Sequence, residues 1–274
     1  MKYENKKKNI FISAKDINID EPVDFGRDIS VNVRGEFTIG KYSRLGDDIQ
    51  IFGNNVIFGE HLYHSSGLRV GGGGRYHPNA NLKIGDRCTI HNNFINVCEP
   101  VVIGNDVGLS HHVSIITHGY WLSVLEGHPR TFASVKLFDG VIVGYRSVIL
   151  MGVNIGKNVV VGAQSVVTKN LKENCIFGGN PAKFIKEIKP IDKETKILKV
   201  KNIISDYMKI AKYHGINPSI KLEYPIITVN NCKFDVEELT YSGVEDVETD
   251  DFRDYVRKCG LRYYSNRPFK SVVA

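Results

Sequence analysis

The sequence lacks several features that mark membrane and secreted proteins. No apolar run approaches the roughly 20 residues that a helix needs to span a bilayer. The first residues, MKYENKKKNIFISAKD, are basic but hold no apolar stretch of the about 7–15 residues found in secretory signals, so we expect no such signal. The five cysteines are odd in number and show no CxxC pair, which favours reduced thiols in a cytoplasmic protein over a disulfide framework.

The composition sets only broad bounds. With 274 residues, the chain is long enough for one large domain and a small one. Hydrophobic residues make up 42% and charged residues 24%, which is typical of soluble globular proteins. The net charge of +6 suits an anionic small-molecule ligand as well as nucleic acid, so it does not choose between them.

A six-residue repeat dominates the stretch from 143 to 167. Aliphatic residues return at every sixth position, at Val143, Ile149, Ile155, Val161 and Val167. This period is neither that of a helix nor that of a half-buried strand, and it predicts a parallel β-helix. Three hexads would close one triangular coil, and successive coils would stack about 4.8 Å apart. We therefore predict a mainly β fold.

The hexad register is predicted to extend over residues 33–190, with two interruptions. Residues 60–82 lose the period and include Gly71–Gly74, but they lack the GK[ST] ending of a phosphate-binding loop. This predicts an excursion that is either a mobile loop or a flap over a substrate. A second excursion, at 118–140, holds the only tryptophan. Residues 1–32 are predicted to form an N-terminal segment with a first imperfect coil.

The repeat is expected to end in a capping helix. Residues 175–188 read CIFGGNPAKFIKEI, in which Gly178-Gly179 turns the chain and Pro181 suits the first turn of a helix. Such a helix would cover the last coil, since terminal repeats need a cap.

Beyond Pro190 the hexads vanish, and residues 191–274 are predicted to form a small α+β domain of unknown role. At helical spacing, one face of a predicted helix carries Ile197, Val200, Ile204, Tyr207 and Ala211. A hairpin is predicted over Asn230-Asn231.

The hexads, the loop after Ile115 and the ending GGNPAKFIKEI resemble the hexapeptide-repeat acyltransferases, most closely the sugar O-acetyltransferases of the galactoside, maltose and surface-polysaccharide type. The resemblance covers about residues 33–188. It implies a left-handed parallel β-helix, acetyl-CoA as co-substrate, and a homotrimer with active sites between subunits. It therefore implies acetyl transfer to a sugar hydroxyl, in surface-polysaccharide or lipopolysaccharide biosynthesis.

The resemblance assigns the catalytic role to His118, because the family's catalytic histidine lies at the start of the extended loop. Histidine titrates near pH 6.5, which suits a general base that takes a proton from an acceptor hydroxyl. The activated oxygen would attack the thioester directly, with the amide of Tyr145 as a candidate oxyanion donor. Candidate acceptor contacts are His112, Glu99 and Trp121, although the family often has Asn where His112 stands.

The resemblance also suggests where CoA binds. Its phosphates require basic side chains, and small residues would let pantetheine approach the backbone. The candidate CoA-binding residues are Gly144, Ala163, Thr168, Lys169, Lys183 and Lys186.

Several alternatives stay open from the sequence. One is N-acetylation of a nucleotide-linked amino sugar, and another is an antibiotic acetyltransferase. A zinc hydratase on the same fold would need three histidines, for which His91, His112 and His118 are imaginable ligands. A purely structural scaffold would leave His118 and the lysines without a role. We expect no metal and no nucleic-acid partner.

Overall fold

The computed structural model describes residues 1–267, which fall into two compact units. The first unit is Met1–Ile188, and the second begins at Lys189. Residues 268–274, at the end of the predicted domain 191–274, lie outside the described residues. Within residues 1–267, no helix is both long and apolar enough to cross a bilayer.

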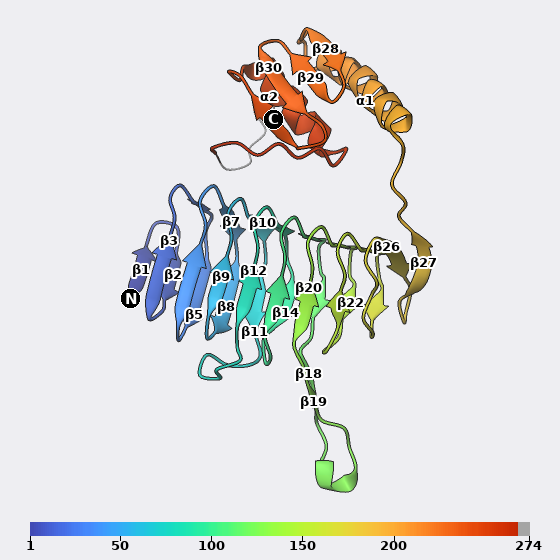
Figure 1. The fold of residues 1–274 in the computed structure, drawn as a ribbon. Coiled ribbons are helices and arrows are strands. Elements are labelled where there is room, and N and C mark those ends of the chain that lie inside the picture. The colour runs from blue at the N-terminus through green and yellow to red at the C-terminus, as the bar shows by residue number, and fades with distance from the viewer. Residues whose placement is uncertain (268–274) are drawn as a thin grey trace. The chain divides into compact units, whose positions relative to one another are not determined.

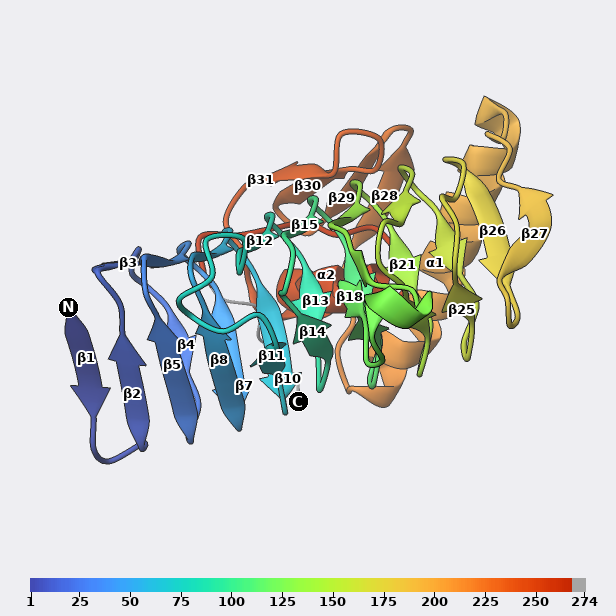
Figure 2. The same cartoon turned by 90° about the horizontal axis from the view of Figure 1, so that it is seen from below.

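The first unit is a coil of three sheets whose strands lie side by side along its axis (Figures 1 and 2). The first sheet contains β1 (Lys2–Asn5), β2 (Ile10–Ser13), β5 (Ile29–Val33), β8 (Ile49–Gly53), β11 (Arg69–Gly71), β14 (Phe94–Asn96), β17 (Ser114–Ile115), β22 (Val148–Ile149) and β25 (Val166–Val167). The second sheet contains β4 (Asp24–Phe25), β7 (Arg44–Asp47), β10 (Tyr63–Ser66), β13 (Thr89–Ile90), β16 (Gly108–Leu109), β21 (Ile142–Val143), β24 (Val160–Val161), β26 (Cys175–Gly178) and β27 (Lys183–Glu187). The third sheet contains β3 (Asp16–Ile19), β6 (Glu36–Ile39), β9 (Val56–Phe58), β12 (Leu82–Ile84), β15 (Val101–Ile103), β20 (Val135–Leu137) and β23 (Asn154–Ile155).

Each turn of the coil runs from the second sheet to the first and then to the third. Strands of successive turns pair in parallel, except for β1 and β27, which pair antiparallel at the two ends. The inward side chains form columns, as in the first sheet, where Val31, Ile51 and Val70 are consecutive partners and all are buried. Burying one such side chain contributes about 1.5–3 kcal/mol, so these columns hold the coil closed. The predicted mainly β fold, a parallel β-helix, is confirmed.

Coil length explains why the repeat is clear only near its C-terminal end. Ile149 pairs with Val167, so that coil has the three full hexads that the sequence shows. Val31 pairs with Ile51, so the earlier coil is two residues longer and breaks the period. For the same reason residues 1–32, predicted as an imperfect start, already form regular parallel coils from β2 onward.

The predicted excursion at 60–82 is wrong in its extent. β10 and β11 lie inside this range, and the chain leaves the coil only at 72–81. The period is hidden because the inward position of β10 is His64, which stacks between Leu45 and Ile90 where an aliphatic residue would be expected.

His64 is a fully buried imidazole within the aliphatic core. Neither ring nitrogen has a hydrogen-bond partner of normal geometry among the described residues. Burial lowers the pKa of His64 to about 4, although the backbone of Ser66 favours the protonated ring. The unfolded chain therefore binds a proton at this residue between about pH 6.5 and pH 4, whereas the folded chain does not.

We expect His64→Leu to raise the free energy of unfolding by about 1–3 kcal/mol at pH 7, because it removes an unsatisfied buried polar group. Stability of the wild type should fall as the pH drops from 7 to 5, and about 2 kcal/mol of that fall should be absent in the variant. Urea unfolding at both pH values measures this. His128→Gln, at an exposed histidine, is the control; equal pH dependence of His64→Leu and the wild type would contradict the assignment.

The predicted capping helix is also wrong, because Lys183–Glu187 form β27. This strand pairs antiparallel with β26, and Phe184 packs edge-on against Phe177 with 5.9 Å between the ring centroids. The free edge of β26 offers hydrogen-bond partners to the whole segment, whereas an isolated helix of this length would be marginal. The repeat therefore ends in a hairpin.

The second unit combines two helices with a four-stranded antiparallel sheet. Its elements are α1 (Lys193–Tyr213), β28 (Ile220–Glu223), β29 (Ile226–Val229), β30 (Cys232–Asp235), β31 (Thr240–Ser242) and α2 (Val247–Arg257). The predicted hairpin over Asn230-Asn231 is confirmed, since Val229 pairs with Cys232 across this turn. Val200, Tyr207 and Ala211 of α1 are buried in one core with residues of the sheet and of α2.

Candidate active site

Two excursions leave the coil at the same corner of the prism. Residues 72–81 follow β11 and residues 116–134 follow β17, so both connect the first sheet to the third (Figure 1). We call the turns that follow the strands of the first sheet the arm corner. The second excursion ends at Ser134 rather than at residue 140 as predicted, because β20 re-enters the third sheet at Val135.

His118 lies at the base of the second excursion, which forms a projecting arm. It begins β18 (His118–Gly119), which pairs antiparallel with β19 (Thr131–Phe132), and a short 3-10 helix, η1 (Val124–Glu126), forms the tip. The half-buried His118 ring stacks on Phe132 and leans on Tyr120, with centroid distances of 5.7 and 5.4 Å. The two strands and the two aromatic rings thus hold His118 in place.

Asn96 fixes the tautomer of the neutral His118 ring. Its Oδ1 accepts from the Thr117 N–H at 3.2 Å, and its Nδ2 donates to the Gly71 carbonyl at 3.3 Å, so the amide has one orientation. His118 Nδ1 lies 2.9 Å from this Oδ1 and must therefore carry the proton that it donates. Nε2 is left with its lone pair, which is the form that a general base requires.

Glu99 joins the same corner. Its backbone N–H donates to Thr117 Oγ1 at 3.2 Å, next to His118 in the chain. Its Oε2 accepts from Asn79 Nδ2 at 2.9 Å, which ties the first excursion to the base of the arm. The structure therefore brings the predicted Glu99 and His118 to one corner, whereas the predicted Trp121 points to solvent and is 90% exposed.

Tyr145 and His112 lie together at a different corner. The turns that lead from the second sheet to the first, which we call the Tyr145 corner, place the two rings edge-to-face at 5.5 Å. His112 precedes β17 and His118 follows it, so roughly 15–20 Å of extended chain separates them. Within one chain, the predicted oxyanion donor Tyr145 is thus not brought to His118.

Comparison with known proteins decides the family. No protein-family model matches the sequence. The chain is 31% identical over 157 residues to WbbJ of Escherichia coli, named as a lipopolysaccharide biosynthesis O-acetyl transferase; the match spans 52% of this chain and 76% of WbbJ. The chain belongs to the hexapeptide-repeat acyltransferases.

Other similar proteins match parts of the chain. The chain is 43% identical to CapG of Staphylococcus aureus over 118 residues, spanning 42% of this chain and 64% of CapG. It is 31% identical to the galactoside O-acetyltransferase of Escherichia coli over 144 residues, spanning 52% and 65% of the two chains. The chain thus spans less than two thirds of the length of these two relatives. Among solved structures, the polysialic acid O-acetyltransferase OatWY is 23% identical with a TM-score of 0.46, over 65% of this chain and 87% of that one.

The CoA-binding residues predicted from the sequence are divided between the same two corners and the final hairpin. Gly144 and Ala163 stack on each other at the Tyr145 corner, and a Cβ on Gly144 would lie 2.5 Å from the Ala163 nitrogen, so glycine is required there. Thr168 and Lys169 are exposed at the arm corner after β25. Lys183 and Lys186 are exposed on β27.

The three histidines considered for zinc do not meet in one chain. His91 stacks on His111 at 4.1 Å at the Tyr145 corner, with its Nδ1 2.8 Å from Ser65 Oγ. His118 lies beyond the other end of β17. Within residues 1–267, no group of three or more His, Cys, Asp or Glu residues is arranged to hold a metal ion.

Asn96 is the site residue that sequence reasoning missed. The inward residues Ile95 and Val97 flank it, and its own side chain is only 2% exposed. The hexad register slips by one residue at this point of the sequence. A polar residue at a register slip, one coil before the arm, is a signal that could have identified it.

Proposed function

We propose that this acyltransferase moves an acetyl group from acetyl-CoA to a hydroxyl of a sugar. The observation that carries the proposal is His118, which donates through Nδ1 to Asn96 and leaves Nε2 free, in a chain of the hexapeptide-repeat family. The names of its relatives support the acceptor class, since WbbJ and the galactoside enzyme are both named as sugar-related O-acetyltransferases. A sugar of a surface polysaccharide or lipopolysaccharide is the acceptor that we propose.

The chemistry follows from the orientation of His118. Nε2 takes the proton of the acceptor hydroxyl as its oxygen attacks the thioester carbonyl. The Asn96 carbonyl oxygen stabilises the imidazolium through the Nδ1–H hydrogen bond. The tetrahedral intermediate then expels the CoA thiolate, which receives the proton from Nε2. The products are an acetyl ester and free CoA, and no covalent intermediate on the protein is needed.

A panel of sugars, nucleotide-linked amino sugars and acetyl-CoA tests this proposal through the release of CoA thiol. We expect release with at least one sugar that has hydroxyl groups only. Treatment of the product with hydroxylamine separates the two classes, because an ester is cleaved and an amide is not. An amide product would establish N-acetylation in place of O-acetylation, and absence of release with every acceptor would contradict acetyl transfer.

We further propose that the active site lies between two copies of the chain in a homotrimer. The two corners of one chain carry complementary halves of the predicted site. The arm corner carries His118, Glu99, Thr168 and Lys169, and the Tyr145 corner carries His112, Tyr145, Gly144 and Ala163. Packing about a threefold axis would join the arm corner of one chain to the Tyr145 corner of the next.

Mixing two inactive variants tests this shared site. His118→Ala disables the arm corner, and Ala163→Trp fills the proposed pantetheine track at the exposed Tyr145 corner. Co-expressed, the two should regain about a quarter of the wild-type rate, because each mixed trimer holds one intact site. Activity no higher than that of either variant alone would contradict a site shared between chains.

The cytoplasm is the proposed location. Its support is the free state of all five cysteines, of which Cys88, Cys98, Cys175 and Cys232 are buried and Cys259 is exposed.

A further inference from the structure

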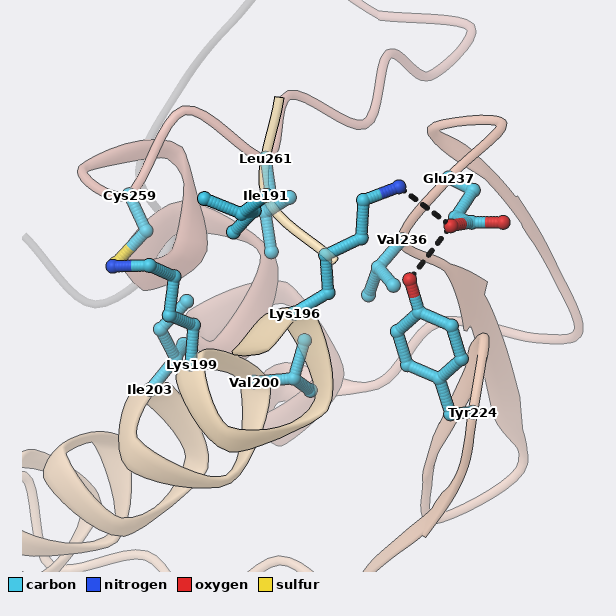
Figure 3. Close-up of a pocket in the computed structure, with 10 residues that line it drawn as sticks. All are labelled: Ile191, Lys196, Lys199, Val200, Ile203, Tyr224, Val236, Glu237, Cys259 and Leu261. Atoms are coloured by element: carbon cyan, nitrogen blue, oxygen red, sulfur yellow. Dashed lines mark hydrogen bonds and ion pairs between the residues drawn. The ribbon is translucent and has the colours of Figure 1, made fainter. Parts of the chain in front are cut away.

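A pocket lies within the second unit, and none of the residues that line it belongs to the proposed active site. It is a cavity of about 350 Å³ against the first turns of α1 (Figure 3). Its walls are mostly apolar side chains, namely Ile191, Val200, Ile203, Val236 and Leu261. A cavity of this size with apolar walls and few polar groups has the usual character of a small-molecule site.

One end of the pocket is closed by a neutralised polar cluster. Glu237 Oε1 accepts from Lys196 Nζ at 2.9 Å and from the Tyr224 hydroxyl at 2.7 Å (Figure 3). The hydrogen bond from Tyr224 and then that from Lys196 lower the pKa of Glu237, and Glu237 raises the pKa of Lys196. The Glu237 carboxylate thus balances the positive charge of Lys196, and the Tyr224 hydroxyl uses its proton in the hydrogen bond to Glu237.

The other end of the pocket carries an unbalanced positive charge. Lys199 lies one helical turn from Lys196 and Ile203 on the same face of α1. Within residues 1–267 it forms no ion pair with a carboxylate. Lys199 and Cys259 both line the pocket and are both exposed, so they lie at its mouth (Figure 3). The pocket therefore combines apolar walls with one available cationic donor.

We propose that this pocket binds a small molecule with one acidic group and an apolar body. The acidic group would pair with Lys199, and the apolar body would replace water against Val200, Ile203 and Leu261. A neutral ligand would leave the Lys199 charge unused. A ligand with several negative charges would be repelled by the Glu237 carboxylate at the far end of the pocket.

A pair of fluorescent probes tests the proposal on the full chain. Anilinonaphthalene sulfonate carries one acidic group on an apolar aromatic body, and N-phenylnaphthylamine has the same body without the charge. We expect Lys199→Glu to weaken binding of the sulfonate about tenfold, which is the lower range for a hydrogen bond to a charged group. Lys201→Glu makes the same change on another face of α1 and should leave binding unchanged.

Cys259 reports where the probe binds. It is the exposed cysteine at the pocket mouth, and the other four cysteines are buried. Bound sulfonate should slow alkylation of Cys259 by iodoacetamide in proportion to the fraction of pockets filled, as followed by peptide mass spectrometry. This readout separates the pocket from the exposed apolar tip of the arm.

Three results would overturn the proposal. One is an alkylation rate of Cys259 that does not change at sulfonate concentrations that saturate the fluorescence. Another is equal weakening by Lys199→Glu and Lys201→Glu, which would show non-specific charge attraction. The third is binding of the neutral probe as tight as that of the sulfonate. None of these measurements involves acetyl transfer, so they are independent of the proposed function.

Discussion

His118→Ala is expected to lower the rate of acetyl transfer by about 10²–10⁴-fold, the usual contribution of a general base. The reason is that no other group replaces Nε2 as the acceptor of the hydroxyl proton. The neighbouring rings Phe132 and Tyr120 carry no base, and Asn96 holds the opposite side of the imidazole. Thiol release from acetyl-CoA at saturating acceptor measures kcat directly.

His128→Ala is the matched control, since His128 lies on the same arm but is exposed. Its turnover should stay within about twofold of the wild type, as surface substitutions usually have small effects. Near-normal turnover of His118→Ala, with an unchanged circular dichroism spectrum and oligomer size, would contradict the assignment of His118 as the general base.

Asn96→Ala is expected to lower kcat by about 10–100-fold, because His118 then has no fixed partner for Nδ1–H and adopts the unproductive tautomer part of the time. Asn96→Asp should retain more activity, since a carboxylate still accepts from Nδ1. Its negative charge should also stabilise the protonated form of the neighbouring imidazole, so the acidic limb of the pH–rate profile should move to higher pH.

The pH profile separates this positioning role from a structural one. Asn96 also accepts from Thr117 and donates to Gly71, so Asn96→Ala should lower stability as well. Thr117→Val is the control that removes a hydroxyl donor from Asn96 Oδ1 but leaves the bond to His118. If Asn96→Asp leaves the acidic limb in place, or Asn96→Ala keeps full kcat in a folded protein, Asn96 does not position the base.

The fold could be predicted where the sequence repeats with a fixed period. Between Val143 and Val167 a buried aliphatic residue returns at every sixth position and each coil has three hexads, so periodicity alone specifies the β-helix. The prediction failed where His64 takes an inward position, because a search for periodic aliphatic residues does not recognise a buried imidazole as part of the core. It also failed where the coils are two residues longer, because the six-residue period is then lost.

The end of the repeat could not be predicted from local signals. Pro181 and the glycines before it fit a helix start, but the segment had to satisfy the open edge of β26. That requirement arises from the tertiary structure, and it cannot be read from the secondary-structure propensities of the segment.

The site itself was predictable only in part. His118 was identified through the family motif, whereas Asn96 meets it only because β14 and β17 are neighbours in the first sheet. The separation of His112 and Tyr145 from His118 likewise follows from their places at opposite ends of a strand. The pocket lined by Lys199 is assembled from the start of α1, two turns of the four-stranded sheet and the segment after α2, and no sequence pattern links these.

Transfer of a labelled acetyl group tests the central claim most directly. The wild-type protein is incubated with acetyl-CoA labelled in its acetyl group and with the sugar that releases most thiol, and the sugar, the CoA and the protein are weighed by mass spectrometry. We predict one labelled acetyl group on the sugar for each CoA thiol released, and none retained on the protein. Thiol release without a labelled sugar, or label held covalently on the protein, would contradict direct transfer by His118.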